Sequence, residues 1–356
     1  MRYVKLGFLK IPYEINNVSN KKIFRICGVK IPFSQYEMDD GQKYYKIFIF
    51  KFKLNFKDKI FVTRKQLNYK NRDKYSDEEI RQISEEIFEE KLGYKPNLEN
   101  PKSMNEKIFW MKLNYHNPMV TRCCDKFRVK DYVTEKLGDG FVVPTINSWK
   151  SADEIDFDAL PERFVLKVNW SSGYNVIVKD KHSLDIERIK KKIDYWLQPQ
   201  QNSYYQTFNW GYKYMEPVVY AEEYIEQMGG QLYDYKFYCC NGKAKFMFIA
   251  TDRYNGEGLT YDFFDMEFNR LGFHYGGRAH SSVKLEKPKF FDEMVRYAER
   301  LAEPFPFVRI DFYELKDKIY VGEMTFYSGG GILPFDPVEW DYRLGEYIDI
   351  TTMERN

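Results

Sequence analysis

The pattern of apolar and polar residues over 307–331 predicts two strands joined by a short polar turn. Side chains alternate between the two faces of a strand, so Arg309 and Asp311 share one face of the first strand. By the same rule, Glu323 and Thr325 share one face of the second strand. If the strands pair through the turn, the two carboxylates lie opposite each other, with the arginine and the threonine beside them.

Two carboxylates that face each other between apolar neighbours repel unless a positive charge lies between them. A divalent metal ion is the simplest source of that charge, so the hairpin predicts a metal site. A run of three glycines at 329–331 follows the second strand and favours a site over a plain turn. The alternative is an ordinary hairpin whose acidic face is open to water.

Period-two patterns predict further strands outside this hairpin. Residues 43–62 alternate aromatic or aliphatic residues with lysines, which indicates a strand or hairpin with one apolar and one basic face. A single strand is expected at 141–149 and another at 218–227. The stretches 164–180 and 232–254 each predict a hairpin, and the second turns at an Asn-Gly pair.

Amphipathic helices account for most of the remaining chain. Capping boxes, Ser76 with Glu79 and Ser103 with Glu106, predict the starts of two helices. A third helix is expected from Asp125 to the glycine at 138, and a fourth at 290–304.

The hairpin at 164–180 carries a lysine, Lys167, in the middle of an apolar strand. A charge there is unfavourable unless an anion meets it, and the turn at Ser171, Ser172 and Gly173 offers backbone N–H groups to the same anion. We therefore expect a phosphate at this hairpin. The alternative is a plain hairpin in which the lysine reaches solvent.

The hairpin at 232–254 places Asp234 and Lys236 on one strand, and Asp252 and Arg253 at the end of the other. Charges at strand ends that open on a cleft can hold a carboxylate substrate, and Arg253 is the best candidate for a bidentate contact. A surface ladder of ion pairs is the alternative.

Composition excludes several classes of protein. Lys plus Arg number 55 and Asp plus Glu number 53, so no strong field attracts nucleic acid. No apolar stretch is long enough to cross a membrane, and the N-terminus lacks the pattern of a signal peptide. Five cysteines with no CxxC spacing fit neither a zinc site nor a disulfide framework. A cytoplasmic protein is expected.

Residues 1–70 differ from the rest of the chain in their basic and aromatic composition. They are expected to form an N-terminal extension. The extension either packs on the main body or rests on an anionic membrane surface or on a partner.

The order of the motifs resembles that of ATP-grasp ligases. Arg309-x-Asp311 followed by Glu323-x-Thr325 is similar to the family pattern R-x-D…E-x-N, whose acids and Asn hold magnesium on the ATP phosphates. Thr325 stands where Asn is usual, and its hydroxyl can ligate the metal or a metal-bound water. Asp125-Lys126 resembles the motif of the D-alanine ligase branch, in which the lysine reaches the phosphates.

Two further stretches carry the same resemblance. The Lys167 hairpin is similar to the glycine loop that folds over the triphosphate, and residues 218–227 resemble the hinge whose backbone holds adenine. Glu222, Glu223 and Glu226 are candidates to bind the ribose or complete the hinge, with Glu223 preferred for the hinge. The resemblance assigns ATP binding to Lys126, Lys167, Ser171, Ser172, Gly173, Glu222, Glu223 and Tyr224.

The phrases NPKSMNEKIFWMKL, DKFRVKDYV, DYKFYCCNGK and RIDFYELKDKIYVGEMTF resemble the TupA-like ATP-grasp proteins of bacterial capsule and surface-polysaccharide gene clusters, named for teichuronopeptide biosynthesis. This implies an α+β ATP-grasp fold, two lobes that grip ATP, behind a short β-rich extension. The expected division is 1–70 extension, 71–160 helical N-terminal lobe, 161–228 small lobe with loop and hinge, and 229–356 C-terminal lobe with the metal site.

The resemblance implies an ATP-dependent ligase that uses ATP and Mg²⁺. It would join a uronic acid carboxylate of a surface polysaccharide, or its precursor, to an amino acid or small amine through an acyl phosphate. The implied residues are Asp311, Glu323 and Thr325 for the metal, and Arg309, Arg253 and Lys236 for catalysis. Two alternatives are a glycosyltransferase, for which Asp156-Phe157-Asp158 would be the metal motif, and an ATP-grasp relic without activity.

Overall fold

The computed structural model describes the backbone of seven strands between residues 2 and 57. From residue 75 to residue 353 it describes the chain except residues 171, 226–232 and 252–258. The chain divides into two compact units, 1–67 and 68–356. The first boundary falls near the end of the predicted extension, while the division of the second unit into three lobes stays a prediction.

The N-terminal unit is built from antiparallel strands in two sheets. One sheet has the order β1-β2-β3-β4 and the other the order β5-β6-β7. The hairpin predicted within 43–62 is present as β6 and β7, which pair antiparallel. The strands are β1 Arg2–Leu6, β2 Leu9–Val18, β3 Lys21–Ile26, β4 Val29–Ile31, β5 Phe33–Glu37, β6 Lys43–Ile49 and β7 Phe52–Lys57.

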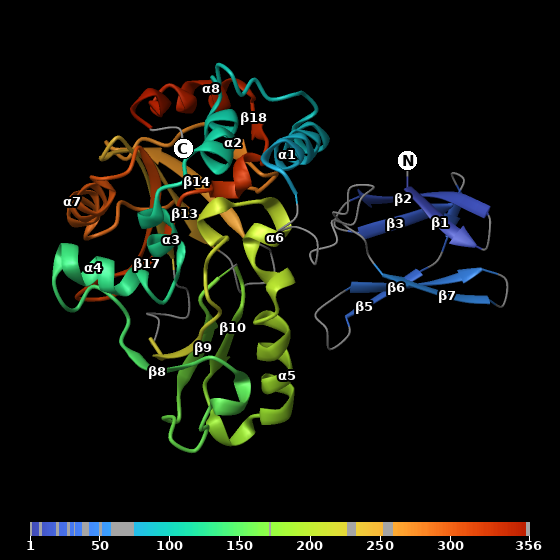
Figure 1. The fold of residues 1–356 in the computed structure, drawn as a ribbon, viewed down its shortest axis with the longest axis horizontal. Coiled ribbons are helices and arrows are strands. Elements are labelled where there is room, and N and C mark those ends of the chain that lie inside the picture. Colours follow the sequence, from blue (N-terminus) through green and yellow to red (C-terminus); the bar gives the residue numbers. More distant parts are fainter. Residues whose placement is uncertain are drawn as a thin grey trace. The chain divides into compact units, whose positions relative to one another are not determined.

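The second unit contains a smaller antiparallel sheet with the order β10-β9-β11-β8 (Figure 1). Its strands are β8 Thr145–Trp149, β9 Phe164–Val168, β10 Asn175–Val178 and β11 Val219–Glu223. The sequence pattern predicts that the first of these strands begins at 141, but it begins after Pro144, which has no N–H to donate to a neighbouring strand.

A larger antiparallel sheet has the order β14-β13-β12-β16-β17. Its strands are β12 Asp234–Cys240, β13 Lys243–Thr251, β14 Thr260–Asp265, β16 Phe307–Glu314 and β17 Ile319–Thr325. Asn241 and Gly242 both have positive φ, 50° and 72°, so the hairpin from β12 to β13 turns as the sequence predicts. A two-stranded sheet, β15 His274–Tyr275 with β18 Phe335–Asp336, lies outside it.

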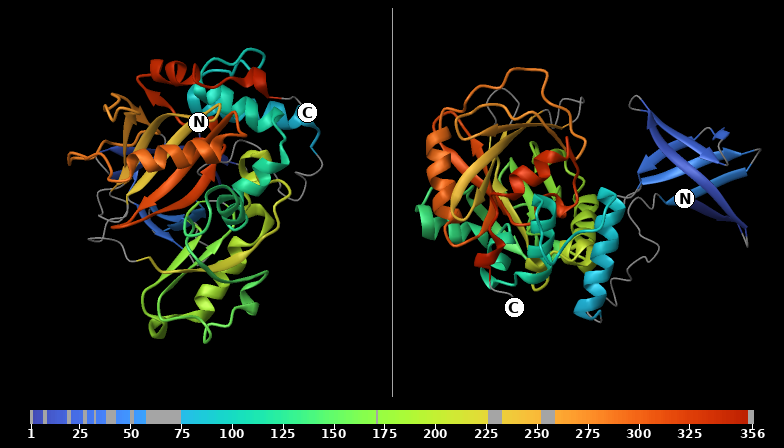
Figure 2. Two further views of the ribbon diagram at one scale, coloured as in Figure 1. Left: turned by 90° about the vertical axis from the view of Figure 1, so that its left-hand side faces the viewer. Right: turned by 90° about the horizontal axis from the view of Figure 1, so that it is seen from above.

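Helices cover the larger sheet on one face and flank the smaller one. Figure 2 shows α7 lying across the larger sheet, where Phe291 packs against Phe237 of β12 with ring centroids 5.7 Å apart. Alongside the smaller sheet, Trp196 of α5 stacks on Tyr174. The helices are α1 Asp77–Leu92, α2 Met104–Asn114, α3 Pro118–Cys124, α4 Val129–Leu137, α5 Ile186–Trp196, α6 Ser203–Thr207, α7 Phe291–Ala302 and α8 Glu339–Gly345.

The predicted starts of α1 and α2 are confirmed, and both helices have complete capping boxes. The helix predicted to start at Asp125 does not start there. The Asp125 carboxylate accepts hydrogen bonds from the backbone N–H groups of Phe127, at 2.8 Å, and Arg128, at 3.0 Å. These bonds hold a turn in place of a helix, so α3 ends before Asp125 and α4 begins at Val129.

A distant residue completes the start of α2. Asp341 of α8 accepts a hydrogen bond from the backbone N–H of Asn105 at 2.9 Å and another from its side-chain amide at 3.0 Å. The first turn of a helix has N–H groups without partners in the helix itself, and here one of them binds a residue near the end of the chain. These two hydrogen bonds connect the start of α2 to α8.

None of the helices that the structure describes has both the length and the apolar character needed to cross a membrane.

Candidate active site

The paired carboxylates lie on neighbouring strands of the larger sheet. Asp311 of β16 is directly opposite Glu323 of β17, and Arg309 is opposite Thr325. This is the register that alternation predicts. Asp311 is buried and Glu323 is half-buried.

Arg309 is the centre of a hydrogen-bonded cluster around these acids. Its guanidinium donates two bonds to Asp311, Nε to Oδ1 at 2.6 Å and Nη2 to Oδ2 at 2.8 Å. It also donates to the Thr325 hydroxyl at 3.0 Å and to the Ser328 hydroxyl at 3.2 Å. Thr325 in turn donates to Glu323 Oε1 at 3.0 Å, so this residue, which stands where the resemblance leads us to expect Asn, belongs to the cluster.

Two lysines bring further positive charge to the pair. Lys236 of β12, the strand next to β16, forms an ion pair with Asp311 and lies 3.6 Å from Asp234. The Lys126 ammonium lies 3.2 Å from Glu323 Oε2. Lys236 therefore belongs to the acidic cluster and does not form part of a surface ladder.

The cations change the ionisation of the site. Burial favours the neutral form of Glu323, but the charges of Lys126, Arg309 and Lys236 outweigh it and lower the pKa of this carboxyl to about 2. Burial disfavours the Arg309 charge, yet Asp311 raises the pKa of the guanidinium well above its ordinary value. Glu323 and Arg309 are therefore both charged at neutral pH. In this structure, side-chain cations supply the positive charge that the sequence pattern assigns to a metal ion.

The donor atoms nevertheless suit magnesium. Mg²⁺ binds through one or two carboxylates, and nucleotide phosphates and water complete its shell. Asp311 and Glu323 offer two carboxylates on facing strands. Across the described part of the chain, no group of three or more His, Cys, Asp or Glu residues could hold a metal ion alone. The residues thus fit a metal ion that arrives with phosphates and not a cage formed by protein alone.

The smaller sheet contributes a second ionic group. Glu222 of β11 is 4% exposed, and its carboxylate forms ion pairs with both Lys130 of α4 and Lys167 of β9. Burial favours the neutral form of Glu222, but the two lysines outweigh it and the pKa of this carboxyl falls below its ordinary value. The anion that meets Lys167 here is thus a carboxylate of the protein.

One short segment links the two ionic groups. Lys126 reaches Glu323 in the larger sheet, and Lys130 reaches Glu222 in the smaller one. The backbone N–H of Lys126 donates a hydrogen bond of 3.0 Å to the carbonyl of Asn169, the residue that follows β9 in the smaller sheet. The site therefore lies between the two sheets, with residues 125–130 on one side of it.

The predicted loop residues follow β9, and the predicted hinge residues lie at the end of β11. Gly173 has a φ of +80°, which a residue with a side chain rarely adopts, and Ser172 is exposed. Glu223 is exposed at the end of β11, and the ring of Tyr224 lies 5.1 Å from the Arg163 guanidinium. Ser171, Glu226, Asp252 and Arg253 lie outside the described residues.

The motif considered for a glycosyltransferase is a surface turn. Asp156 Oδ1 accepts hydrogen bonds from the backbone N–H groups of Asp158, at 3.0 Å, and Ala159, at 3.2 Å. Phe157 is buried between the two exposed acids. The first carboxylate thus stabilises its own turn.

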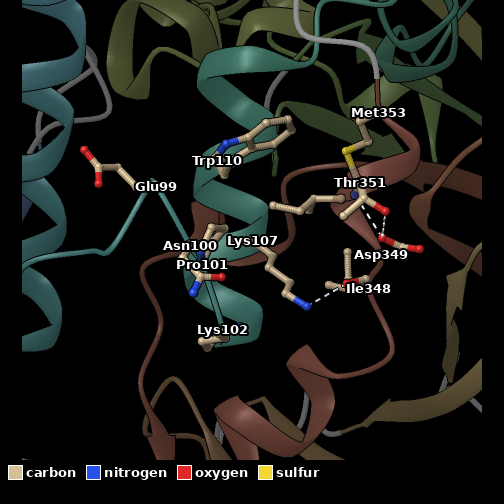
Figure 3. Close-up of a pocket in the computed structure, with 11 residues that line it drawn as sticks. Glu99, Asn100, Pro101, Lys102, Lys107, Trp110, Ile348, Asp349, Thr351 and Met353 are labelled. Atoms are coloured by element: carbon tan, nitrogen blue, oxygen red, sulfur yellow. Dashed lines mark hydrogen bonds between the residues drawn. The ribbon is translucent and has the colours of Figure 1, made fainter.

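A cavity of about 320 Å³ lies elsewhere, between the start of α2 and residues 348–353 (Figure 3). Lys107 lines it and donates hydrogen bonds to the carbonyls of Gly345, at 2.9 Å, and Ile348, at 2.7 Å. The cavity shares no residue with the ionic site. It does not alter the location of the candidate active site.

Three residues of the site were missed from the sequence. Lys130 follows Lys126 by four residues, and this spacing could have indicated a second lysine near the site. Ser328 and Tyr238 share a hydrogen bond of 2.8 Å beside Arg309. No local signal identifies these two, because they are brought together by strand pairing and by the turn after β17.

The ionic site lies between two sheets, of which the larger carries the paired carboxylates and the smaller carries the Lys167 hairpin. This arrangement is an ATP-grasp fold. Comparison with protein families supports this description and identifies the branch. The family described as TupA-like ATPgrasp matches residues 106–349, more than half of the chain. The chain belongs to the TupA-like ATP-grasp family.

Solved structures with distant similarity were also found. A D-alanine–D-alanine ligase from Bacillus anthracis aligns at 16% identity over 62% of this chain and 64% of its own, with a TM-score of 0.36. A RimK domain ATP-grasp protein from Sphaerobacter thermophilus aligns at 14% identity over 64% of this chain and 69% of its own, with a TM-score of 0.34. Similarity at these TM-scores does not bear on the activity of this chain. No curated protein matches the chain.

Proposed function

We propose that this protein is an ATP-dependent carboxylate–amine ligase. It would join a uronic acid carboxylate of a capsular or surface polysaccharide, or of its precursor, to an amino acid or small amine. The observation that carries the proposal is the pair Asp311 and Glu323, held face to face and surrounded by Arg309, Lys126 and Lys236. Family membership supports the use of ATP, and the choice of a uronic acid rests on the resemblance of the sequence.

The proposed reaction has two steps. A carboxylate oxygen of the acid substrate attacks the γ-phosphorus of ATP, the bond from this phosphorus to its bridging oxygen breaks, and ADP leaves. The amine nitrogen then attacks the acyl carbon, the bond from this carbon to the phosphorylated oxygen breaks, and phosphate leaves while the amine loses a proton. Both steps need charge neutralisation and alignment more than a protein nucleophile.

Each residue of the site has a proposed task in these steps. Arg309 would lie against the transferred phosphoryl group, and Lys126 and Lys167 would hold the α- and β-phosphates. Lys236 keeps Asp311 in place through their ion pair. Arg253 would bind the carboxylate of the substrate.

Magnesium would be held by Asp311 and Glu323, with Thr325 beside them, and would supply positive charge to the phosphate oxygens. Ser171, Ser172 and Gly173 would approach the nucleotide from the loop after β9. We assign adenine and ribose to the strand end at 222–224. A cytoplasmic location follows from the need for ATP, and the unit 1–67 is a candidate for contact with the inner membrane or with other capsule enzymes.

Thermal stability with and without ligands tests the proposal. ATP with Mg²⁺ should raise the melting temperature of the full chain, because a ligand that binds the native state stabilises it. Uronic acids paired with amines should then release ADP and phosphate. Stabilisation by a UDP-sugar with Mn²⁺, and none by ATP with Mg²⁺, would favour the glycosyltransferase alternative.

The Glu323→Gln variant tests the paired carboxylates directly. It keeps the shape of the side chain and removes one of two negative charges, so we expect ADP release to fall by at least about 100-fold. Glu299→Gln, which changes a surface ion pair with Lys243, is the matched control and should retain activity. Unchanged turnover in Glu323→Gln would remove the central residue of the proposal.

A further inference from the structure

Glu222 is shared by two lysines from different elements. Lys130 of α4 lies 2.6 Å from Oε1, and Lys167 of β9 forms an ion pair with Oε2. The carboxylate is buried, so each of its oxygens depends on one ammonium for a partner. This group lies at the strand end that we assign to the nucleotide.

The two lysines differ in how firmly they are held. The Lys130 ammonium also donates to the Val143 carbonyl at 2.8 Å and to the Thr145 hydroxyl at 2.7 Å. With Glu222, these acceptors occupy all three of its N–H donors. Its side chain is 13% exposed. Lys130 is therefore fixed between α4, β8 and β11.

Lys167 is less restrained. Its side chain is 26% exposed, twice as much as that of Lys130, and within the described residues Glu222 is its ion-pair partner. It lies on β9, next to the loop at 172–173. An anion at this loop could draw the Lys167 ammonium away from Glu222 by rotation of a flexible side chain.

Such a movement would leave Glu222 with one countercharge. A buried carboxylate that loses every cation is strongly unfavourable, so Lys167 could leave only if another charge remains. Lys130 provides that charge and cannot move without losing two further hydrogen bonds.

We propose that Lys130 is a positioning residue, the fixed countercharge of Glu222 that allows Lys167 to move from this carboxylate to the phosphates of the nucleotide. The inference rests on the proposed use of ATP. The two lysines then have different roles, because Lys167 contacts the nucleotide while Lys130 acts through Glu222. Without Lys130, Glu222 would retain Lys167 and compete with the nucleotide for it.

The test measures the affinity of the full chain for a non-hydrolysable ATP analogue with Mg²⁺ by titration calorimetry. Lys130→Met should weaken binding by roughly tenfold or more, because Lys167 is then retained by Glu222. Lys136→Met, which removes another lysine from α4, is the matched control and should bind as the wild type does.

A double variant separates this role from simple bracing of the fold. Glu222→Gln removes the charge that retains Lys167, so Lys130→Met combined with Glu222→Gln should bind within about threefold of Glu222→Gln alone. If Lys130 only braces α4 against β8, the loss caused by Lys130→Met persists in the double variant and the inference is wrong. Melting temperatures without nucleotide check that each variant is folded.

The outcomes for the two proposals are distinct. If the wild type does not bind the analogue with Mg²⁺, the proposed function fails. If the wild type binds it and Lys130→Met binds equally well, the function stands and the role of Lys130 is refuted. Lys167→Met should weaken binding in either background, with or without Glu222→Gln, because it removes the contact with the phosphates itself.

Discussion

Replacing Lys112 of α2 with methionine should stabilise the protein. The residue is 2% exposed, its ammonium lies 3.7 Å from the centroid of the Phe109 ring, and it donates a long hydrogen bond of 3.5 Å to the Gly330 carbonyl. These contacts replace little of the hydration that an ammonium has in water. Methionine has a similar length and carries no charge, so Lys112→Met fills the same space without that cost.

The magnitude follows from the pKa of Lys112, which burial lowers from 10.5 to about 7. A difference of one pKa unit corresponds to about 1.4 kcal/mol, so the charged form lowers the free energy of unfolding by roughly 5 kcal/mol. Lost packing and the weak contact with Gly330 reduce the gain from the substitution. We expect Lys112→Met to raise the free energy of unfolding by roughly 2–4 kcal/mol at pH 6.

The pH dependence has a definite sign. Below pH 7, Lys112 is protonated in both the folded and the unfolded protein, and the cost of the buried charge is fully present. Between pH 7 and pH 10.5 the unfolded chain binds one more proton than the folded one, so stability of the wild type rises with pH. The advantage of Lys112→Met should therefore shrink by roughly 2–3 kcal/mol between pH 6 and pH 9.

Urea denaturation of both proteins at pH 6, 7, 8 and 9 measures this difference, and contributions from other groups cancel between them. Lys112→Leu is a second variant that removes the charge and tests whether the gain depends on the shape of methionine. A wild type more stable than both variants at pH 6, or a difference that does not change with pH, would refute the reasoning.

Two further predictions concern the turn after β17 and the charges of the site. A Cβ at Gly331 would lie 2.9 Å from the Asn105 carbonyl, while one at Gly330, which has the same φ of +66°, would make no close contact. Gly331→Ala should therefore lower the free energy of unfolding, measured in urea, by about 2 kcal/mol more than Gly330→Ala. Equal losses would show that the contact with Asn105 relaxes. Because Lys126, Lys236 and Arg309 neutralise the paired carboxylates, Mg²⁺ alone should change the melting temperature little, and Mg²⁺ with ATP should raise it more than the sum of the separate effects. A large shift with Mg²⁺ alone would contradict this charge balance.

Local patterns predict the parts of this molecule that depend on neighbours in sequence. The register of Asp311 against Glu323 follows from a period of two and a short turn, and the starts of α1 and α2 follow from their capping boxes. The start of α4 could not be predicted in the same way. Asp125 can begin a helix or hold a turn, and its bond from the distant Asn169 side chain, at 2.8 Å, accompanies the turn.

The ion pairs of the site could not be predicted from local sequence patterns. Lys236 reaches Asp311 because β12 and β16 pair across a long separation in sequence. Lys126 reaches Glu323 from the turn before α4, which lies outside the larger sheet. Alternation gives the face of each side chain but not the strand that lies beside it. Motif order over several segments predicts the candidate residues, while their ion pairs required the structure.

The bond between Asn105 and Asp341 has a consequence for synthesis of the chain. Residues of α2 leave the ribosome long before Asp341 is made, because 236 positions separate the two residues. Until then the start of α2 lacks this partner, and the face of α2 that packs against α8 is uncovered. The nascent protein should therefore need protection, by a chaperone or by delayed compaction, until α8 emerges. Shortening the chain before Asp341 would make that temporary exposure permanent.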